Sequence, residues 1–264
     1  MSRNFAPARR RFGQHFLHDR AAIRRIIDAF SPQPGQRIVE IGPGRGALTR
    51  ELLNRVSELH AVELDRDLAA WLQTEFRSGS YRLTVHEADA LAFDFRKLVV
   101  DRVPLRIIGN LPYNISTPLL LRLLEYNAII KDMCFMLQRE VAERLAAVPG
   151  TKQYGRLTVM VRSLCTVEKV LTLGAAAFSP PPKVESTVVK LVPFVQDPYG
   201  ITNRTRFADV VRRGFGQRRK TIRNALQPLL DARAIESAGI DSGLRADQLS
   251  IEQFAMLSAI RTTL

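Results

Sequence analysis

The sequence has few cysteines and lacks a long apolar run. Cys134 and Cys165 are the only cysteines among 264 residues, and each lies within an apolar stretch. Two such thiols predict buried, reduced side chains and exclude a disulfide framework or a cysteine zinc site. No apolar run approaches the roughly 18 residues of a membrane span, and no apolar segment with a cleavage site follows the N-terminal arginines. We therefore expect a soluble, cytoplasmic protein that has no membrane partner.

Acidic residues are scarce relative to basic ones. The chain has 39 Lys+Arg against 26 Asp+Glu, a net charge of +13. Residues 1–25 and 204–223 carry the whole excess, and the rest of the chain is neutral. A single charge run is usually a solvated face, but two runs that hold the entire excess favour binding to a phosphate backbone. The candidate contacts are Arg9, Arg10, Arg11, Arg218, Arg219, Lys220 and Arg223.

Strand and helix patterns alternate along most of the chain. Short apolar strand patterns lie at 37–42, 59–64, 81–89, 105–110 and 132–138, with helical patterns between and after them. This alternation predicts an α/β fold with a Rossmann-like parallel sheet. We expect 156–165 and 186–193 to close the sheet as antiparallel strands, because little helix separates them.

The pattern changes to helix alone from about residue 200. Pro193, Pro198 and Gly200 interrupt regular structure in the segment 193–200. The sequence therefore predicts two domains, a sheet domain at 1–197 with a basic N-terminal arm and a small helical domain at 198–264. We expect 215–226 to form a basic helix at its start, which makes this domain a candidate for binding the phosphate backbone of a nucleic acid.

A glycine-rich turn follows the first strand of the predicted sheet. The segment EIGPGRG places Gly42, Gly44 and Gly46 where the chain turns from strand to helix. Glycines there allow a ligand to approach the backbone closely, and dinucleotide-binding folds use the same device. The G-x-G-x-G spacing after a strand-end acid favours S-adenosylmethionine.

Acidic residues end the second and third strands. The carboxylate of Glu63 can accept hydrogen bonds from both ribose hydroxyls, or it can be a surface acid beside a base. Asp89 can accept from an adenine amino group while the Ala90 amide reaches a ring nitrogen, or it can cap a helix. These residues are candidate cofactor contacts because ligands bind at the carboxyl edge of such sheets.

The segment Asn110-Leu111-Pro112-Tyr113 follows the fourth strand at the same edge. It can be an ordinary turn rich in Asn and Pro. It can also act on an adenine, whose exocyclic amine is a poor nucleophile. The Asn110 side-chain oxygen and the Pro112 carbonyl can hold that amine, while the Tyr113 ring stacks on the base. This chemistry requires no metal.

With these motifs the chain resembles the ribosomal RNA adenine dimethyltransferases, most closely the bacterial small-subunit group. The resemblance covers nearly the whole chain and rests on ordered blocks. They include RRFGQHFLHD (10–19), VEIGPGRGALT (39–49), VELDRDLAA (62–70), NLPYNISTPLL (110–120), MLQREVAERL (136–145), YGRLTVM (154–160), AFSPPPKVESTVVKL (177–191) and FGQRRKTIRNAL (215–226).

The resemblance implies dimethylation of N6 on two adjacent adenosines near the 3′ end of 16S ribosomal RNA during small-subunit biogenesis. S-adenosylmethionine would be the donor and S-adenosylhomocysteine the product. It implies that the GQHFL segment, with His15 and Leu17, contacts the cofactor together with Gly42, Gly44, Glu63, Asp89, Ala90 and Asn110. It further implies that Asn110, Pro112 and Tyr113 hold the adenine and that Phe178 packs on its other face; from the residues alone, Phe178 is equally a core aromatic. The expected partner is 16S ribosomal RNA in the immature small subunit, and nothing in the sequence indicates a dimer.

The chain departs from the family pattern at His15, where many members carry Asn. An imidazole does not present the paired donor and acceptor of an amide, so the role of His15 is less certain than that of Leu17. Three other functions remain open: a large-subunit RNA methyltransferase, an N6-adenine DNA methyltransferase, and an assembly factor that acts mainly by binding. The block 215–226 favours the small-subunit enzyme, and the small second domain disfavours the DNA enzyme.

Overall fold

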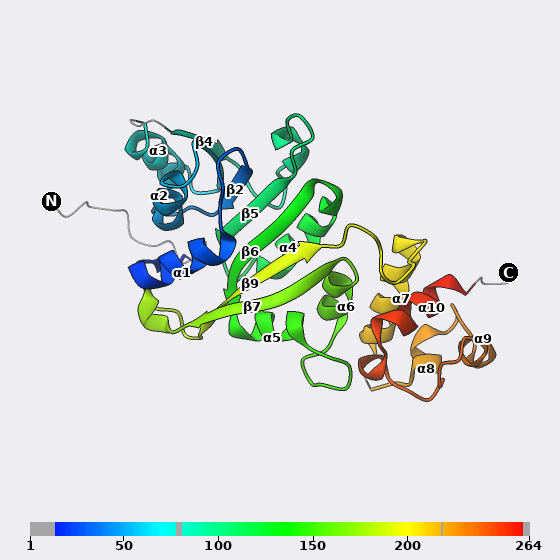
Figure 1. Ribbon diagram of the computed structural model, residues 1–264. Coiled ribbons are helices and arrows are strands. Elements are labelled where there is room, and N and C mark those ends of the chain that lie inside the picture. The colour runs from blue at the N-terminus through cyan, green and yellow to red at the C-terminus, as the bar shows by residue number, and fades with distance from the viewer. Residues whose placement is uncertain (1–13, 78–80, 218, 261–264) are drawn as a thin grey trace. The chain divides into compact units, whose positions relative to one another are not determined.

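The computed structural model describes residues 14–77, 81–217 and 219–260, and Figure 1 shows the arrangement of their elements. The strands are β1 (Phe16–Leu17), β2 (Arg37–Ile41), β3 (Glu58–Glu63), β4 (Arg82–Glu87), β5 (Leu105–Asn110), β6 (Ile130–Gln138), β7 (Cys165–Leu173), β8 (Phe178–Ser179) and β9 (Ser186–Pro193). The helices are α1 (Arg20–Phe30), α2 (Ala47–Leu53), α3 (Arg66–Glu75), α4 (Ser116–Leu124), α5 (Arg139–Ala146), α6 (Arg156–Arg162), α7 (Arg204–Gly216), α8 (Ile222–Leu226), α9 (Ala232–Ser237) and α10 (Ile251–Ala259).

The main sheet has seven strands in the order β4-β3-β2-β5-β6-β9-β7. The pairs β2–β3, β3–β4, β2–β5 and β5–β6 are parallel, and β9 runs antiparallel to β6. The strand order reverses between β2 and β5, which is where open α/β sheets form a ligand crevice. The α/β fold, the parallel core and the antiparallel strand at 186–193 are thus confirmed.

Residues 156–165 do not form the predicted strand. They begin with α6, and the strand β7 starts only at Cys165. Gly155 N–H donates to the Thr158 hydroxyl oxygen at 3.1 Å, and that hydroxyl donates to the Arg144 carbonyl at 2.6 Å. These bonds cap the first turn of a helix and anchor it. A short apolar run fits either period, so tertiary contacts decided the outcome.

A buried ion pair ties the first helix to the sheet. The guanidinium of Arg106 on β5 bonds both carboxylate oxygens of Asp132 on β6, each at 2.7 Å. The same guanidinium donates to the carbonyls of Phe30 and Ser31, which end α1. Charged donors satisfy the open carbonyls of a helix end. The helix before the sheet is therefore fixed at its C-terminus by a residue far along the chain.

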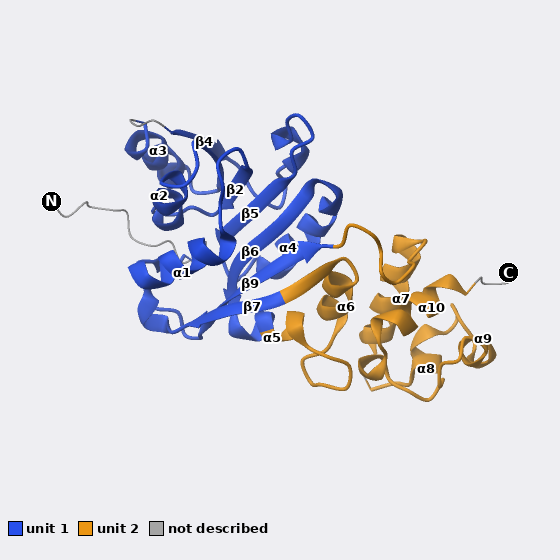
Figure 2. Cartoon of the chain, in the orientation of Figure 1, with its two compact units in different colours: residues 1–142, 168–193 blue, residues 143–167, 194–264 orange. Residues whose placement is uncertain are grey.

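The chain divides into two compact units, drawn in different colours in Figure 2. Unit 1 comprises 1–142 and 168–193, and unit 2 comprises 143–167 and 194–264. Residues 143–167 join the helical unit because Tyr154 and Val159 belong to its core, and the Tyr154 hydroxyl donates to the Leu249 carbonyl at 2.9 Å. The domain boundary after residue 197 stays a prediction. Each unit contains one buried cysteine, Cys134 in unit 1 and Cys165 in unit 2.

Gly109 lies where β5 passes β2 just before the cavity described below. A Cβ at this position would lie 2.3 Å from the Ile41 carbonyl oxygen, a backbone atom that cannot move away without shifting β2. We expect Gly109→Ala to lower the free energy of unfolding by about 3 kcal/mol, as overpacking of a core does. Urea unfolding measures the effect. Gly174→Ala is the matched control, because that glycine has nothing within 4 Å; equal stability of both variants would contradict the prediction.

Candidate active site

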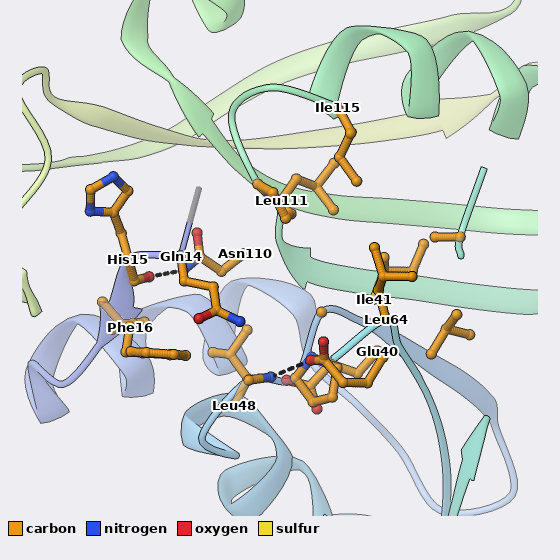
Figure 3. Close-up of a pocket in the computed structure, with 18 of the residues that line it drawn as sticks. Gln14, His15, Phe16, Glu40, Ile41, Leu48, Leu64, Asn110, Leu111 and Ile115 are labelled. Atoms are coloured by element: carbon orange, nitrogen blue, oxygen red, sulfur yellow. Dashed lines mark hydrogen bonds between the residues drawn. The ribbon is translucent and has the colours of Figure 1, made fainter. Parts of the chain in front are cut away.

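A cavity lies at the carboxyl ends of β2, β3 and β5, at the reversal of strand order (Figure 3). The predicted residues that line it are His15, Leu17, Gly42, Gly44, Glu63, Asp89, Ala90, Asn110, Pro112 and Tyr113. Gln14 and Phe16 of the GQHFL segment also line it, and so do Glu40, Arg45, Leu64 and Ile115, which the sequence analysis did not select. All of them belong to unit 1. The structure thus gathers the predicted cofactor and adenine residues around one cavity, with the exception of Phe178.

The glycine turn has the backbone conformation that glycine alone adopts readily. The φ angles of Gly42, Gly44 and Gly46 are 66°, 55° and 70°. A Cβ at Gly44 would lie 3.1 Å from the Phe16 ring, and one at Gly46 would lie 2.9 Å from the Phe76 ring. Side chains at these positions would be strained and crowded. The turn therefore brings bare backbone to the cavity.

Glu63 ends β3 and faces the glycine turn. Its carboxylate accepts from Gly44 N–H at 3.0 Å and from Asp65 N–H at 2.9 Å. Burial raises the pKa of the Glu63 carboxyl, and the two backbone bonds act against this rise. The acid thus braces the turn and also lines the cavity. Its contact with ribose hydroxyls stays a prediction.

Asp89 caps the turn that follows β4. Its Oδ1 accepts from Leu91 N–H at 2.9 Å, as expected for the capping alternative. The neighbouring residue Ala90 is buried and borders the cavity, and its N–H has no protein acceptor among the described residues. A buried amide of this kind needs a partner, so it is well suited to a ligand acceptor. The adenine contact stays a prediction for both residues.

Glu40 is a buried acid that the sequence analysis noted only as part of the turn. Its side chain is 1% exposed and accepts from the Thr49 hydroxyl at 2.6 Å. Burial, aided by the nearby Glu63 carboxylate, raises the pKa of the Glu40 carboxyl to about 8. It lies two residues before Gly42 in the sequence and lines the cavity. The position of Glu40 at the end of a strand, directly before the glycine turn, was the feature of the sequence that could have identified it.

The NLPY segment is held on two sides. The Asn110 amide nitrogen donates to the His15 carbonyl at 2.8 Å, as the dashed line in Figure 3 marks. The Tyr113 hydroxyl lies 2.7 Å from the Ser186 hydroxyl, and the two share a hydrogen bond. Burial raises the pKa of the Tyr113 phenol, so the hydroxyl stays protonated. The Pro112 carbonyl accepts from Ile115 N–H at 3.1 Å.

Residues of the GQHFL segment reach the site through a pairing that sequence patterns do not indicate. The strand β1 pairs antiparallel with β8, with Leu17 opposite Phe178. The Phe178 side chain is 2% exposed, belongs to the core cluster of unit 1 and does not line the cavity. In this structure it packs as the core aromatic that the residues alone equally allowed. Its stacking on a base stays a prediction.

The prediction of one basic helix over 215–226 is wrong. The helix α7 ends at Gly216 and α8 begins at Ile222. Between them Thr221 pairs with Arg245, and Ile222 N–H donates to the Leu244 carbonyl at 2.6 Å. Because another segment takes these backbone groups, the helix cannot continue.

The predicted RNA-binding residues are described only in part. Arg219 and Lys220 are exposed in the turn before α8, and Arg223 is exposed on α8. The other predicted contacts, Arg9, Arg10, Arg11 and Arg218, lie outside the described residues. None of the described helices is long and apolar enough to cross a membrane. The described ranges also contain no group of three or more His, Cys, Asp or Glu side chains arranged to hold a metal ion.

Comparisons with known proteins agree with this geometry. A family model described as ribosomal RNA adenine dimethylase matches residues 6–262. The chain is 50% identical to the "Ribosomal RNA small subunit methyltransferase A" of Pseudomonas aeruginosa, over 95% of this chain and 93% of that protein. The protein of the same name from Vibrio cholerae is also 50% identical, over 95% and 92%.

Two solved structures share the fold over almost the whole chain. A dimethyladenosine transferase from Plasmodium falciparum has a TM-score of 0.79 and 26% identity, covering 92% of this chain and 96% of that one. The 23S rRNA methyltransferase ErmE has a TM-score of 0.72 and 28% identity, covering 92% and 98%. With a family model that spans the two compact units, a glycine turn and an NLPY segment around one cavity, the chain belongs to the ribosomal RNA adenine dimethylase family.

Proposed function

We propose that this protein dimethylates N6 of two adjacent adenosines near the 3′ end of 16S ribosomal RNA, with S-adenosylmethionine as methyl donor. The observation that carries this proposal is the position of Asn110. It ends β5 next to the glycine turn, where a Cβ at Gly42 would lie 3.7 Å from the Asn110 carbonyl oxygen. The group that would hold an amine therefore adjoins the group that would hold the donor.

The lining of the cavity fits S-adenosylmethionine. The glycine turn presents bare backbone, Glu63 presents a carboxylate for hydroxyl groups, and the N–H of the buried residue Ala90 has no protein acceptor among the described residues. Leu64 and Ile115 add apolar surface suited to a purine. When bound, the cofactor supplies an electrophilic methyl on a sulfonium. The residues that would hold it come from the ends of β2, β3 and β4.

The residues of the NLPY segment would prepare the amine. The lone pair of an exocyclic adenine amine is delocalised into the ring, so it attacks poorly. The Asn110 side-chain oxygen and the Pro112 carbonyl, which retains a second lone pair, can each accept one amine hydrogen. Held in this way, the nitrogen becomes more tetrahedral and its lone pair points toward the methyl. Tyr113 would stack on the base.

Several finer points belong to the same proposal. S-adenosylhomocysteine leaves as product, and the chemistry needs no metal because the sulfonium is already activated. The substrate is the immature small subunit, and the enzyme acts as a cytoplasmic monomer.

Arg219, Lys220 and Arg223 are exposed and suited to phosphate contacts, which position RNA without reading its sequence. The RNA-binding role of unit 2 is supported by its share of the basic excess.

The direct test is transfer of labelled methyl from S-adenosylmethionine to small subunits that lack the modification. Large subunits and duplex DNA are assayed in parallel, and nucleosides are analysed afterwards. We expect dimethyladenosine in the small-subunit RNA alone. Label in large-subunit RNA or in DNA would overturn the substrate assignment but keep the cofactor site. No label in any nucleic acid would leave a binding role in assembly.

A charge-neutralising change at Glu63 should weaken cofactor binding. We expect Glu63→Gln to raise the Kd for S-adenosylmethionine at least about tenfold, since hydrogen bonds to charged groups contribute about 1.5–3 kcal/mol. Isothermal titration calorimetry gives this Kd. Glu58→Gln, at the opposite end of the same strand in a surface pair with Arg37, is the matched control. Equal affinities for the two variants would remove Glu63 from the cofactor site.

A further inference from the structure

Residues 14–16 divide between two sides of the extended segment. Figure 3 shows the His15 ring pointing away from the side chains of Gln14 and Phe16. The Gln14 amide donates to Asp65 Oδ2 at 3.3 Å, and the Phe16 ring lies against Gly44. Both thus face the predicted cofactor side. Successive side chains of an extended segment alternate between its two sides, so His15 must face elsewhere.

The His15 ring lies against the residues on the adenine side. It stacks on the Tyr113 ring, with centroids 5.4 Å apart and planes inclined by 29°. Its Nδ1 lies 2.8 Å from the Pro180 carbonyl oxygen. A carbonyl can only accept, so Nδ1 carries the hydrogen and donates it. The ring is therefore fixed between Tyr113 and the loop that contains β8.

The Tyr113 side chain is consequently held at its hydroxyl and at one face of its ring. Its hydroxyl shares a hydrogen bond with Ser186, and the His15 imidazole covers one face of its ring. A base that stacks on Tyr113 then takes the opposite face. Aromatic pairs of this kind are oriented contacts rather than simple filler. Loss of the imidazole would leave the Tyr113 ring free to tilt about its hydroxyl anchor.

The main chain of His15 contacts Asn110, the other residue predicted to hold the adenine amine. Its carbonyl accepts from the Asn110 amide nitrogen at 2.8 Å. An amide whose nitrogen is engaged on one side presents its oxygen on the other. The oxygen is the atom that must accept a hydrogen from the adenine amine. One residue thus contacts both Asn110 and Tyr113, by main chain and side chain respectively.

We infer that His15 is a positioning residue for the target adenine, acting through Tyr113 and Asn110, rather than a side-chain contact to the cofactor. The inference rests on the proposed function and names the side of that site to which His15 belongs. It also gives the departure from the family Asn a consequence. An imidazole supplies an aromatic face to Tyr113 that an amide does not.

The test compares His15→Ala with Gln14→Ala in the full chain. We expect His15→Ala to lower kcat for methylation of small subunits about tenfold, because misplaced reacting groups slow transfer, while the Kd for S-adenosylmethionine changes less than about twofold. Gln14→Ala, on the opposite side of the segment, should show the reverse pattern. His15→Phe keeps a ring on Tyr113 and should recover most of the lost kcat.

A spectroscopic measurement separates this role from a general loss of structure. The chain has 5 tyrosines, so selective ring labelling gives few NMR signals. The Tyr113 signal should lose its ring-current shift in His15→Ala and keep a shift in His15→Phe.

An unchanged Tyr113 signal, or a tenfold rise in the cofactor Kd with normal kcat, would overturn the inference. Wild-type protein that methylates no small subunit would instead overturn the proposed function alone. The cofactor Kd and the Tyr113 signal would still show on which side His15 acts.

Discussion

Asn110→Ala is expected to reduce methyl transfer to small subunits by about two to three orders of magnitude, the usual loss when one preorganised hydrogen-bonding group is removed from a reaction centre. The substitution deletes the side-chain oxygen that would accept from the adenine amine, together with the amide nitrogen that donates to the His15 carbonyl. It leaves the Asn110 main chain and the adjoining glycine turn in place. Single-turnover transfer of labelled methyl measures the loss directly.

The same variant should still bind the cofactor. Asn110 lines the cavity, but its amide nitrogen is already engaged by the His15 carbonyl, and the glycine turn and Glu63 remain. We expect the Kd for S-adenosylmethionine to stay within about threefold, since a net neutral hydrogen bond contributes only about 1 kcal/mol. Asn54→Ala, at the exposed C-terminal end of α2, is the control for substitution itself. Transfer within tenfold of wild type would show that the oxygen is dispensable.

Raising the pH from 5 to 8 should destabilise the wild-type protein through Glu40. The pKa of this carboxyl is about 8 in the folded chain, against 4.5 for an unperturbed glutamate. The folded state therefore holds a proton that the unfolded state releases between these values. The stabilisation is full below pH 4.5 and is lost as the pH rises through the folded pKa. Over the whole shift, the free energy of unfolding should fall by about 5 kcal/mol.

Urea unfolding at several pH values isolates this effect. Glu40→Gln is neutral throughout, so its stability should vary much less with pH than that of the wild type. Glu185→Gln, which removes an exposed carboxylate paired with Arg139 on the surface, should follow the wild-type curve. Parallel curves for wild type and Glu40→Gln would mean that the buried carboxyl is already ionised at pH 5.

Local patterns were enough to predict the parallel core of the fold. The five strands from 37 to 138 could be located because each is a short strand pattern, and all but the third are followed directly by a helical period. The segment 156–165 failed because its apolar residues fit both periods, and the Thr158 bonds that fix a helix involve the distant Arg144 carbonyl. The segment 215–226 failed because Thr221 and Ile222 are paired with residues 244 and 245.

The site was predicted where its residues follow strands in order. Glu63 and Asn110 end β3 and β5, and Gly42 and Asp89 closely follow β2 and β4, so the topology alone brings them to one edge. The pairing of β1 with β8 has no such local signal, because two residues carry no period. The side to which His15 points follows from that pairing and therefore required the structure.

The alkylation rates of the two cysteines can report local unfolding in each of the two compact units. Cys134 and Cys165 are both buried, and burial raises the pKa of each thiol to about 12. The thiolate is the nucleophile that attacks alkylating reagents, so each buried thiol reacts only when its surroundings open. Because one thiol lies in each compact unit, the two alkylation rates report the opening free energies of the units separately. Equal rates would mark one cooperative folding unit, and unequal rates would rank the two units by their resistance to opening.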